Sequence, residues 1–142
     1  MRLITYTQGT DPRPGLALSD TVGLDLLAAD PTLPDTWHAL FSELHRVRRI
    51  HDDHLEALQR VEPRAELPLP LIALEEVQLL APVLLPSKVI GVGLNYHDHA
   101  AEQDRRPPEQ PMLFGKAPSS LQSHDGPIGL TADLTQVDAE AE

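Results

Sequence analysis

A histidine and a glutamate lie three residues apart, at His99 and Glu102, shortly after the apolar run of residues 89–92. On a helix, this spacing places two side chains one turn apart on the same face, so they can meet. A carboxylate that accepts a hydrogen bond from one imidazole nitrogen orients the ring and leaves the other nitrogen as a base. Such pairs usually lie on exposed helix faces. Here the pair follows a Gly-x-Gly-x-Asn turn, where backbone can approach a ligand, and this context favours general-base chemistry.

A second pair of acidic residues, Glu140 and Glu142, is separated by one residue within the alternating segment 136–142. On a strand, side chains at this spacing emerge on the same face. Two carboxylates that point together repel unless a hard cation lies between them, and oxygen ligands suit Mg²⁺, Mn²⁺ or Ca²⁺. The same pattern is common in solvated acidic tails. The pair therefore leaves a metal site and an exposed tail both open.

Other chemical groups give weaker signals. Lys116 follows a predicted strand over residues 111–115, where an ammonium group can hold an anionic substrate, although a surface lysine is the default. His51 and His54 share a helix face but lie among charged residues, which favours a solvated face over a metal site. Tyr96 stands where the third glycine of a dinucleotide-binding turn should be, so that function is disfavoured.

The composition of the 142 residues excludes several classes of protein. The formal net charge of −11 repels phosphate backbones, so we expect no nucleic-acid partner. The absence of cysteine excludes disulfides, thiolate metal sites and a cysteine nucleophile. No apolar run approaches the ~18 residues of a membrane span, and the N-terminus has no apolar targeting segment. We therefore expect a soluble, cytoplasmic protein with no membrane partner.

The first part of the chain predicts a small antiparallel sheet followed by one long helix. Residues 2–7, 16–18 and 21–26 are β-rich, and residues 10–15 read as a turn. After Asp35, a good N-cap, apolar residues recur at helical spacing and predict a helix over about residues 36–60. These positions are Trp37, Leu40, Phe41, Leu44, Val47, Ile50 or His51, Leu55 and Leu58.

The rest of the chain is divided by proline, which accounts for 14 residues and ends helices. Residues 63–71 form a proline-rich connection, and the prolines between 107 and 127 predict extended loop walls. Between these stretches we predict a buried strand over residues 88–93, a helix over 96–103 that Asn95 can cap, and a strand over 111–115.

Three segments, in this order and spacing, resemble the fumarylacetoacetate hydrolase family. They are residues 88–102 (KVIGVGLNYHDHAAE), 111–116 (PMLFGK) and 137–142 (VDAEAE). The resemblance implies a metal-dependent enzyme that acts on 2-oxo or β-diketo acids by C–C bond hydrolysis, decarboxylation or isomerisation. It further implies that His99 is the general base, that Glu102 orients it, and that Glu140 and Glu142 bind Mg²⁺ or Mn²⁺. Lys116 matches a lysine that we place near the substrate.

The expected fold class is α+β. A small N-terminal sheet with one long helix and a proline-rich linker forms a domain over residues 1–83, and residues 84–142 begin a mostly β catalytic domain. Members of the family continue past this point and supply a further Asp ligand and a second lysine. We therefore expect a fragment with weak metal affinity and little turnover, and a homodimer when complete. The alternative is a non-catalytic truncated domain with structural or partner-pairing roles.

Overall fold

The protein was analysed as a computed structural model that describes residues 1–60, 70–102, 104, 106 and 108–138. For residues 60, 99 and 102 it describes the backbone alone. The chain divides into two compact units. Unit 1 contains the described residues of Met1–Leu84 together with Gln122–Gly126, and unit 2 contains Leu85–Leu121 and the described residues from 127 onward.

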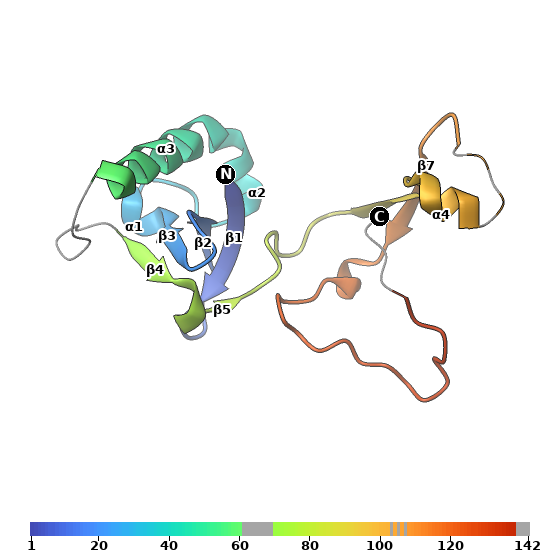
Figure 1. The fold of residues 1–142 in the computed structure, drawn as a ribbon. Coiled ribbons are helices and arrows are strands. Elements are labelled where there is room, and N and C mark those ends of the chain that lie inside the picture. The colour runs from blue at the N-terminus through green and yellow to red at the C-terminus, as the bar shows by residue number, and fades with distance from the viewer. Residues whose placement is uncertain (61–69, 103, 105, 107, 139–142) are drawn as a thin grey trace. The chain divides into compact units, whose positions relative to one another are not determined.

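Unit 1 is built on a curled antiparallel sheet with the strand order β4-β3-β2-β1-β5 (Figure 1). The five strands are β1 (Arg2–Thr7), β2 (Arg13–Ala17), β3 (Val22–Asp25), β4 (Leu71–Ala73) and β5 (Gln78–Leu79). Together with one long helix, this sheet confirms the predicted α+β class and the predicted N-terminal antiparallel sheet. The two short outer strands were not predicted. A 3₁₀ turn, η3 (Leu74–Glu76), connects them.

The helical segment of unit 1 is more broken than the predicted single helix over residues 36–60. It begins as α2 (Trp37–Leu40), tightens into a 3₁₀ turn, η1 (Phe41–Glu43), and continues as α3 (Leu44–Arg60). Its N-cap is Thr36 rather than Asp35. The tighter winding rotates the apolar stripe, so Phe41 is 44% exposed although its spacing predicted a buried position.

The core of unit 1 lies between the sheet and these helices. Leu16 pairs with Leu3 on one side and with Leu24 on the other, so all three side chains point to the same face of the sheet. Trp37 and Leu40 of α2 and Val47 and Ile50 of α3 are buried against this face. The Trp37 indole Nε1 also donates a hydrogen bond of 3.0 Å to the carbonyl oxygen of Ile4. The tryptophan therefore ties α2 to β1 by packing and by a polar contact.

The start of β2 corrects the predicted turn over residues 10–15. The strand already begins at Arg13 and includes Pro14, which cannot donate to a ladder and was therefore expected outside a central strand. The ladder between β2 and β3 starts at Gly15, which pairs with Asp25. Pro14 therefore pairs with Thr5 of β1, but it has no partner on β3, because the ladder between β2 and β3 does not reach it.

The end of β3 is determined by the carboxylate of Asp25. One of its oxygens accepts hydrogen bonds from the backbone N–H groups of Leu27 and Ala28, which caps the short helix α1 (Leu26–Ala29). The other oxygen accepts from the Arg13 guanidinium at 2.7 Å. Burial, followed by hydrogen bonding to Asp25, raises the pKa of the Tyr6 phenol to about 12. The Tyr6 phenol therefore stays neutral near pH 7, and hydrogen bonding to Asp25 keeps the Arg13 guanidinium charged by raising its pKa.

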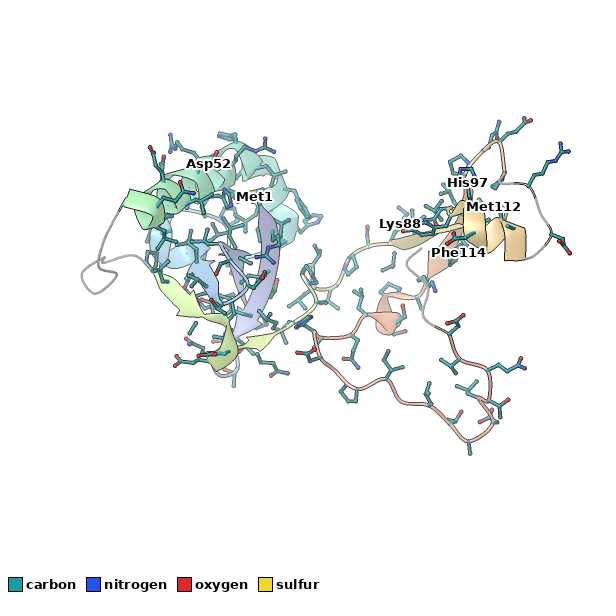
Figure 2. The ribbon with its side chains drawn as sticks, in the orientation of Figure 1. Met1, Asp52, Lys88, His97, Met112 and Phe114 are labelled. Atoms are coloured by element: carbon teal, nitrogen blue, oxygen red, sulfur yellow. The ribbon has the colours of Figure 1, made fainter. Side chains whose placement is uncertain are left out.

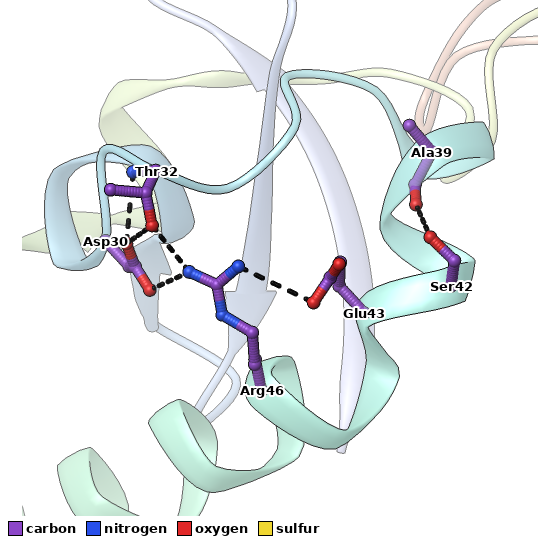
Figure 3. A network of polar contacts seen from close by, with 6 residues as sticks. All are labelled: Asp30, Thr32, Ala39, Ser42, Glu43 and Arg46. Carbon is purple, nitrogen blue, oxygen red and sulfur yellow. Dashed lines mark hydrogen bonds and ion pairs between the residues drawn. The ribbon is translucent and has the colours of Figure 1, made fainter.

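A polar network joins the end of α1 to the start of α3 (Figure 3). The Asp30 carboxylate accepts hydrogen bonds from the Thr32 hydroxyl and from the Arg46 guanidinium, both at 2.6 Å. Arg46 also donates to the Thr32 hydroxyl and approaches Glu43 at 3.5 Å. The hydrogen bonds from Thr32, and then those from Arg46, lower the pKa of Asp30 to about 2.

This network predicts a defined acid response. Because the folded protein holds the pKa of Asp30 below its usual value of 3.8, the stabilisation it provides is complete above that pH and is lost as the pH falls through about 2. We expect Asp30→Asn to lower the midpoint of urea unfolding at pH 5, and to differ progressively less from the parent protein between pH 4 and pH 2. Asp53→Asn on α3 controls for the lost charge. Parallel acid profiles for the parent and Asp30→Asn would contradict the prediction.

The described part of unit 2 contains a two-stranded antiparallel ribbon and a short α-helix. The ribbon pairs β6 (Val89–Gly93) with β7 (Met112–Lys116), and α4 (His97–Glu102) follows β6. A 3₁₀ turn, η4 (Pro118–Ser120), follows β7. The expectation of a buried strand over residues 88–93 is wrong in part, because Ile90 is 57% exposed. In the described part of the chain β6 pairs with β7 alone, and such a ribbon leaves much of its surface uncovered.

Candidate functional site: the turn between β6 and α4

The turn that joins β6 to α4 has an unusual backbone. Leu94 adopts a φ of +52°, in the left-handed region, although its side chain is 8% exposed. This conformation costs a residue other than glycine about 1–2 kcal/mol, and it is rare for a bulky side chain. The turn lets the chain leave the ribbon and begin a helix within four residues, from Gly93 to His97. Local strain of this kind is found preferentially at functional sites.

A cavity of about 280 Å³ lies beside this turn. One wall is formed by the end of β6, the turn and the first residue of α4, where Figure 2 labels His97. The opposite wall is formed by Pro108, Glu109 and Pro111. Two of the predicted loop-wall prolines therefore do line a cavity. The polar side chains on its walls are Asn95, Tyr96, His97 and Glu109, and all four are exposed.

The structure describes the predicted site residues to different extents. His99 and Glu102 lie on α4, so their three-residue spacing does fall on a helix, but their side chains are outside the described part. Glu140 and Glu142 also lie outside the described residues. Residues 136–138, the described part of the alternating segment, form no regular strand. The helix that carries His99 begins at the cavity, which places the predicted base in this region of the fold.

Lys116 lies at the other end of the ribbon from the cavity. It pairs with Val89, whereas Met112, at the start of β7, pairs with Gly93 next to the turn. Four strand residues span roughly 13 Å, so the backbone of Lys116 is separated from the cavity by the length of the ribbon. Its ammonium group lies 5.2 Å from the centre of the Phe114 ring, in a cation–π contact. The structure does not bring Lys116 together with the turn.

The described residues contain no group of three or more His, Asp or Glu side chains that could hold a metal ion. This includes the histidines of α3, where His51 Nδ1 lies 2.7 Å from Asp52 and His54 Nδ1 lies 2.7 Å from the carbonyl of Ile50. Residues 51–54 lie within α3, which confirms the predicted helix at this segment. The donors predicted for a metal, Glu140 and Glu142, are not among the residues searched.

The cavity rests on a ribbon whose geometry depends on one glycine. Gly91 of β6 pairs directly with Phe114 of β7, and the aromatic ring lies over the glycine. A Cβ atom at Gly91 would clash with Phe114 Cζ and would lie 2.8 Å from Cε1 and Cε2 of the same ring, which is closer than real Cβ atoms approach other atoms. Gly115, one residue along β7, has no atom within 4 Å of the equivalent position. The glycine at residue 91 is therefore required by the ring, and the glycine at residue 115 is not required by contacts.

We expect Gly91→Ala to displace the Phe114 ring and to destabilise the ribbon by about 1–3 kcal/mol, the usual cost of overpacking. Gly115→Ala is the matched control and should have little effect. The measurement is the nuclear Overhauser contact between the backbone of residue 91 and the Phe114 ring, together with amide exchange in β6. Retention of this contact and of exchange protection in Gly91→Ala would show that the ring is not held over the glycine.

One family model matches the second part of the chain. Residues 88–142 match the family model described as "Fumarylacetoacetate (FAA) hydrolase C-terminal". This match begins one residue before β6 and includes the turn, α4 and β7. No helix of the described residues is long and apolar enough to cross a membrane.

Curated relatives match along the whole chain. The "Oxaloacetate tautomerase fahd2, mitochondrial" of Xenopus laevis is 33% identical over 145 positions, which cover 100% of this chain and 42% of the relative. The proteins named oxaloacetate tautomerase in Rattus norvegicus (Fahd2a) and Homo sapiens (FAHD2A) are 36% and 34% identical over 100% of this chain and 43% of their own length. The chain belongs to the fumarylacetoacetate hydrolase family. It spans about two fifths of the length of these relatives.

Proposed function

We propose that the chain contributes the general-base helix and part of the substrate cavity to an enzyme that interconverts the keto and enol forms of a 2-oxo acid. The observation that carries the proposal is the cavity of about 280 Å³ at the start of α4, the helix of His99 and Glu102. Relatives that match the whole chain are named oxaloacetate tautomerases, which favours isomerisation over hydrolysis or decarboxylation.

The chemistry requires one proton to move in each direction. A base removes a proton from the carbon next to the 2-oxo group, and the resulting enolate becomes an enol when its oxygen is protonated. An imidazole has the appropriate pKa range for both transfers near neutral pH. In this proposal His99 carries the proton, and Glu102, one turn along the same helix, fixes the orientation of the imidazole. Of the exposed polar side chains of the cavity, Asn95, Tyr96 and His97 can donate hydrogen bonds to the carboxylate end of the substrate.

A divalent cation completes the proposal. The carboxylates of Glu140 and Glu142 are hard oxygen donors of the kind that bind Mg²⁺ or Mn²⁺, and Ca²⁺ accepts the same donors. When bound, the ion would supply positive charge to the carboxylate and 2-oxo oxygens of the substrate. Two carboxylates alone hold such an ion weakly, so we expect the isolated chain to bind Mg²⁺ only at millimolar concentrations or above.

A chimera tests the proposal. In the Xenopus laevis relative, the portion matched by this chain is replaced by the chain itself, and the rate of oxaloacetate enol-to-keto conversion is measured with and without Mg²⁺. We expect the chimera to catalyse the conversion and the 142-residue chain alone to show little or none. A folded chimera that binds Mg²⁺ but does not accelerate the conversion would reject the proposed function.

The exposed ribbon supports a second candidate, a non-catalytic domain that pairs with another chain. Ile90 and Leu113 are 57% and 65% exposed, and they lie on one face of the ribbon because Leu113 pairs with Val92, two residues from Ile90. Exposed apolar side chains that lie together mark interaction surfaces. Pairing through this surface would also produce the homodimer that we propose for the complete protein. Calorimetric titration with Mg²⁺ separates the two candidates. A metal site gives a heat of binding that is lost in Glu140→Gln and in Glu142→Gln. A purely structural domain gives no heat of binding.

A further inference from the structure

The unit 1 sheet has a hollow on the face opposite the helices. Leu3, Leu16 and Leu24 point toward the helices, so their neighbours Ile4, Ala17 and Gly23 point to the other face. The small side chain of Ala17 leaves space above the strands, whereas Leu74 covers Gly23. The resulting hollow has a volume of about 550 Å³, within the usual range of small-molecule sites.

The floor of this hollow is apolar and firmly packed. A Cβ atom added to Gly23 would lie 2.8 Å from Leu74 Cδ2 and 3.4 Å from Ile4 Cδ1, so these two side chains close over the glycine. Leu79 and Leu80 form a side wall, and Leu80 is held there by a 2.8 Å hydrogen bond from its N–H to the carbonyl of Thr5. Ile4, Leu74, Leu79 and Leu80 all remain partly exposed, because they face the hollow.

The rim of the hollow is polar and carries the charged side chains of Arg2 and Asp20 and the imidazole of His124. Arg2 and His124 both line it, the latter from the segment Gln122–Gly126 of unit 1. Arg2 lies 2.9 Å from Asp20, and His124 lies 3.6 Å from Asp125. Both acidic partners are more than 90% exposed, and exposed ion pairs of this kind contribute at most about 1 kcal/mol. A ligand carboxylate can therefore displace Asp20 from Arg2, and it would contact the guanidinium next to a drier surface.

We propose that this hollow binds a small amphipathic monocarboxylate, an alkyl or aryl chain with a single carboxylate. The hydrocarbon part contacts Ile4, Leu74 and Leu80, and the carboxylate accepts hydrogen bonds from the guanidinium of Arg2 and from His124. An apolar floor with a few polar groups at one end fits this class of ligand. A dicarboxylate fits poorly, because its second charge would have to enter the apolar part.

The test is a titration of the 142-residue chain with hexanoate at pH 7, followed by NMR through the Ala17 methyl group, which lines the hollow. We expect a saturable shift with hexanoate and about tenfold weaker binding of hexanol, because the charge-assisted hydrogen bonds are missing. Arg2→Gln should weaken hexanoate binding about tenfold and leave hexanol binding unchanged. Arg48→Gln, on an exposed position of α3, is the control for loss of one positive charge.

A second variant tests the position of the ligand without changing charge. In Ala17→Leu, the larger side chain projects from β2 and fills the hollow. This variant should abolish the binding of both hexanoate and hexanol. Circular dichroism, which reports on the helical signal of α3, confirms that the variant is folded. The proposal is overturned if hexanoate produces no saturable shift, or if hexylammonium binds as tightly as hexanoate. It is also overturned if Arg2→Gln and Arg48→Gln weaken binding equally. These measurements do not depend on any activity of the turn site.

Discussion

In the chimera, His99→Gln should lower the rate of oxaloacetate tautomerisation about 100- to 10,000-fold, the range that a positioned general base contributes. Glutamine keeps a polar side chain of similar length but cannot carry the proton. Glu102→Gln should reduce the rate less, because it changes the orientation and basicity of the imidazole rather than removing it.

The control for this experiment is His45→Gln, which removes an exposed histidine of α3 in unit 1. It should retain the parent rate. Circular dichroism and Mg²⁺ binding of both variants must match the parent chimera, so that a lost rate reports on the proton transfer. Turnover of His99→Gln equal to that of the parent would reject the assignment of His99 as the base, even if the chimera is an active tautomerase.

The largest expected effect on stability belongs to Trp37. Trp37→Ala should lower the free energy of unfolding of unit 1 by about 3–5 kcal/mol, because it removes a large buried side chain from the core. The indole is 4% exposed and also donates its N–H to the Ile4 carbonyl. Since domains of this size are stable by about 5–15 kcal/mol in total, the variant should be close to unfolding at 37 °C. The measurement is urea unfolding followed by circular dichroism.

Two further variants separate packing from hydrogen bonding. Trp37→Phe retains most of the apolar contact but leaves the Ile4 carbonyl without its donor, so its cost should be well below that of Trp37→Ala. Phe41→Ala, one helical turn along and 44% exposed, should cost least of the three. If Phe41→Ala destabilises unit 1 as much as Trp37→Ala, the core is not organised around the tryptophan.

The parts of the fold that could be predicted are those determined by local pattern. The apolar spacing from Trp37 to Leu58 was sufficient to predict helical structure, and the β-rich runs before it were sufficient to predict β1 and β3. The outer strands β4 and β5 are only three and two residues long. Their strand conformation depends on pairing with β3 and β1, and no local pattern indicates which distant edge a short segment will join.

The candidate site was likewise predicted only where local sequence determines the structure. The helix that carries His99 was predicted from its cap and its following prolines, and the chemistry of the pair came from its spacing and from the family resemblance. The cavity was not predicted, because Glu109 and the prolines beside it come from a segment separated from the turn by more than ten residues. The left-handed Leu94 was not predicted either, since nothing in its residue type favours that conformation.

The distribution of aromatic residues gives the protein a separate optical probe in each unit. Its single tryptophan, Trp37, is buried in unit 1, and its two tyrosines are divided between the buried Tyr6 of unit 1 and the exposed Tyr96 of unit 2. Selective excitation of the indole therefore follows the melting of one unit alone. Tyr96 lines the cavity beside α4, so its emission should respond to quenchers in solution and be shielded when a ligand fills that cavity.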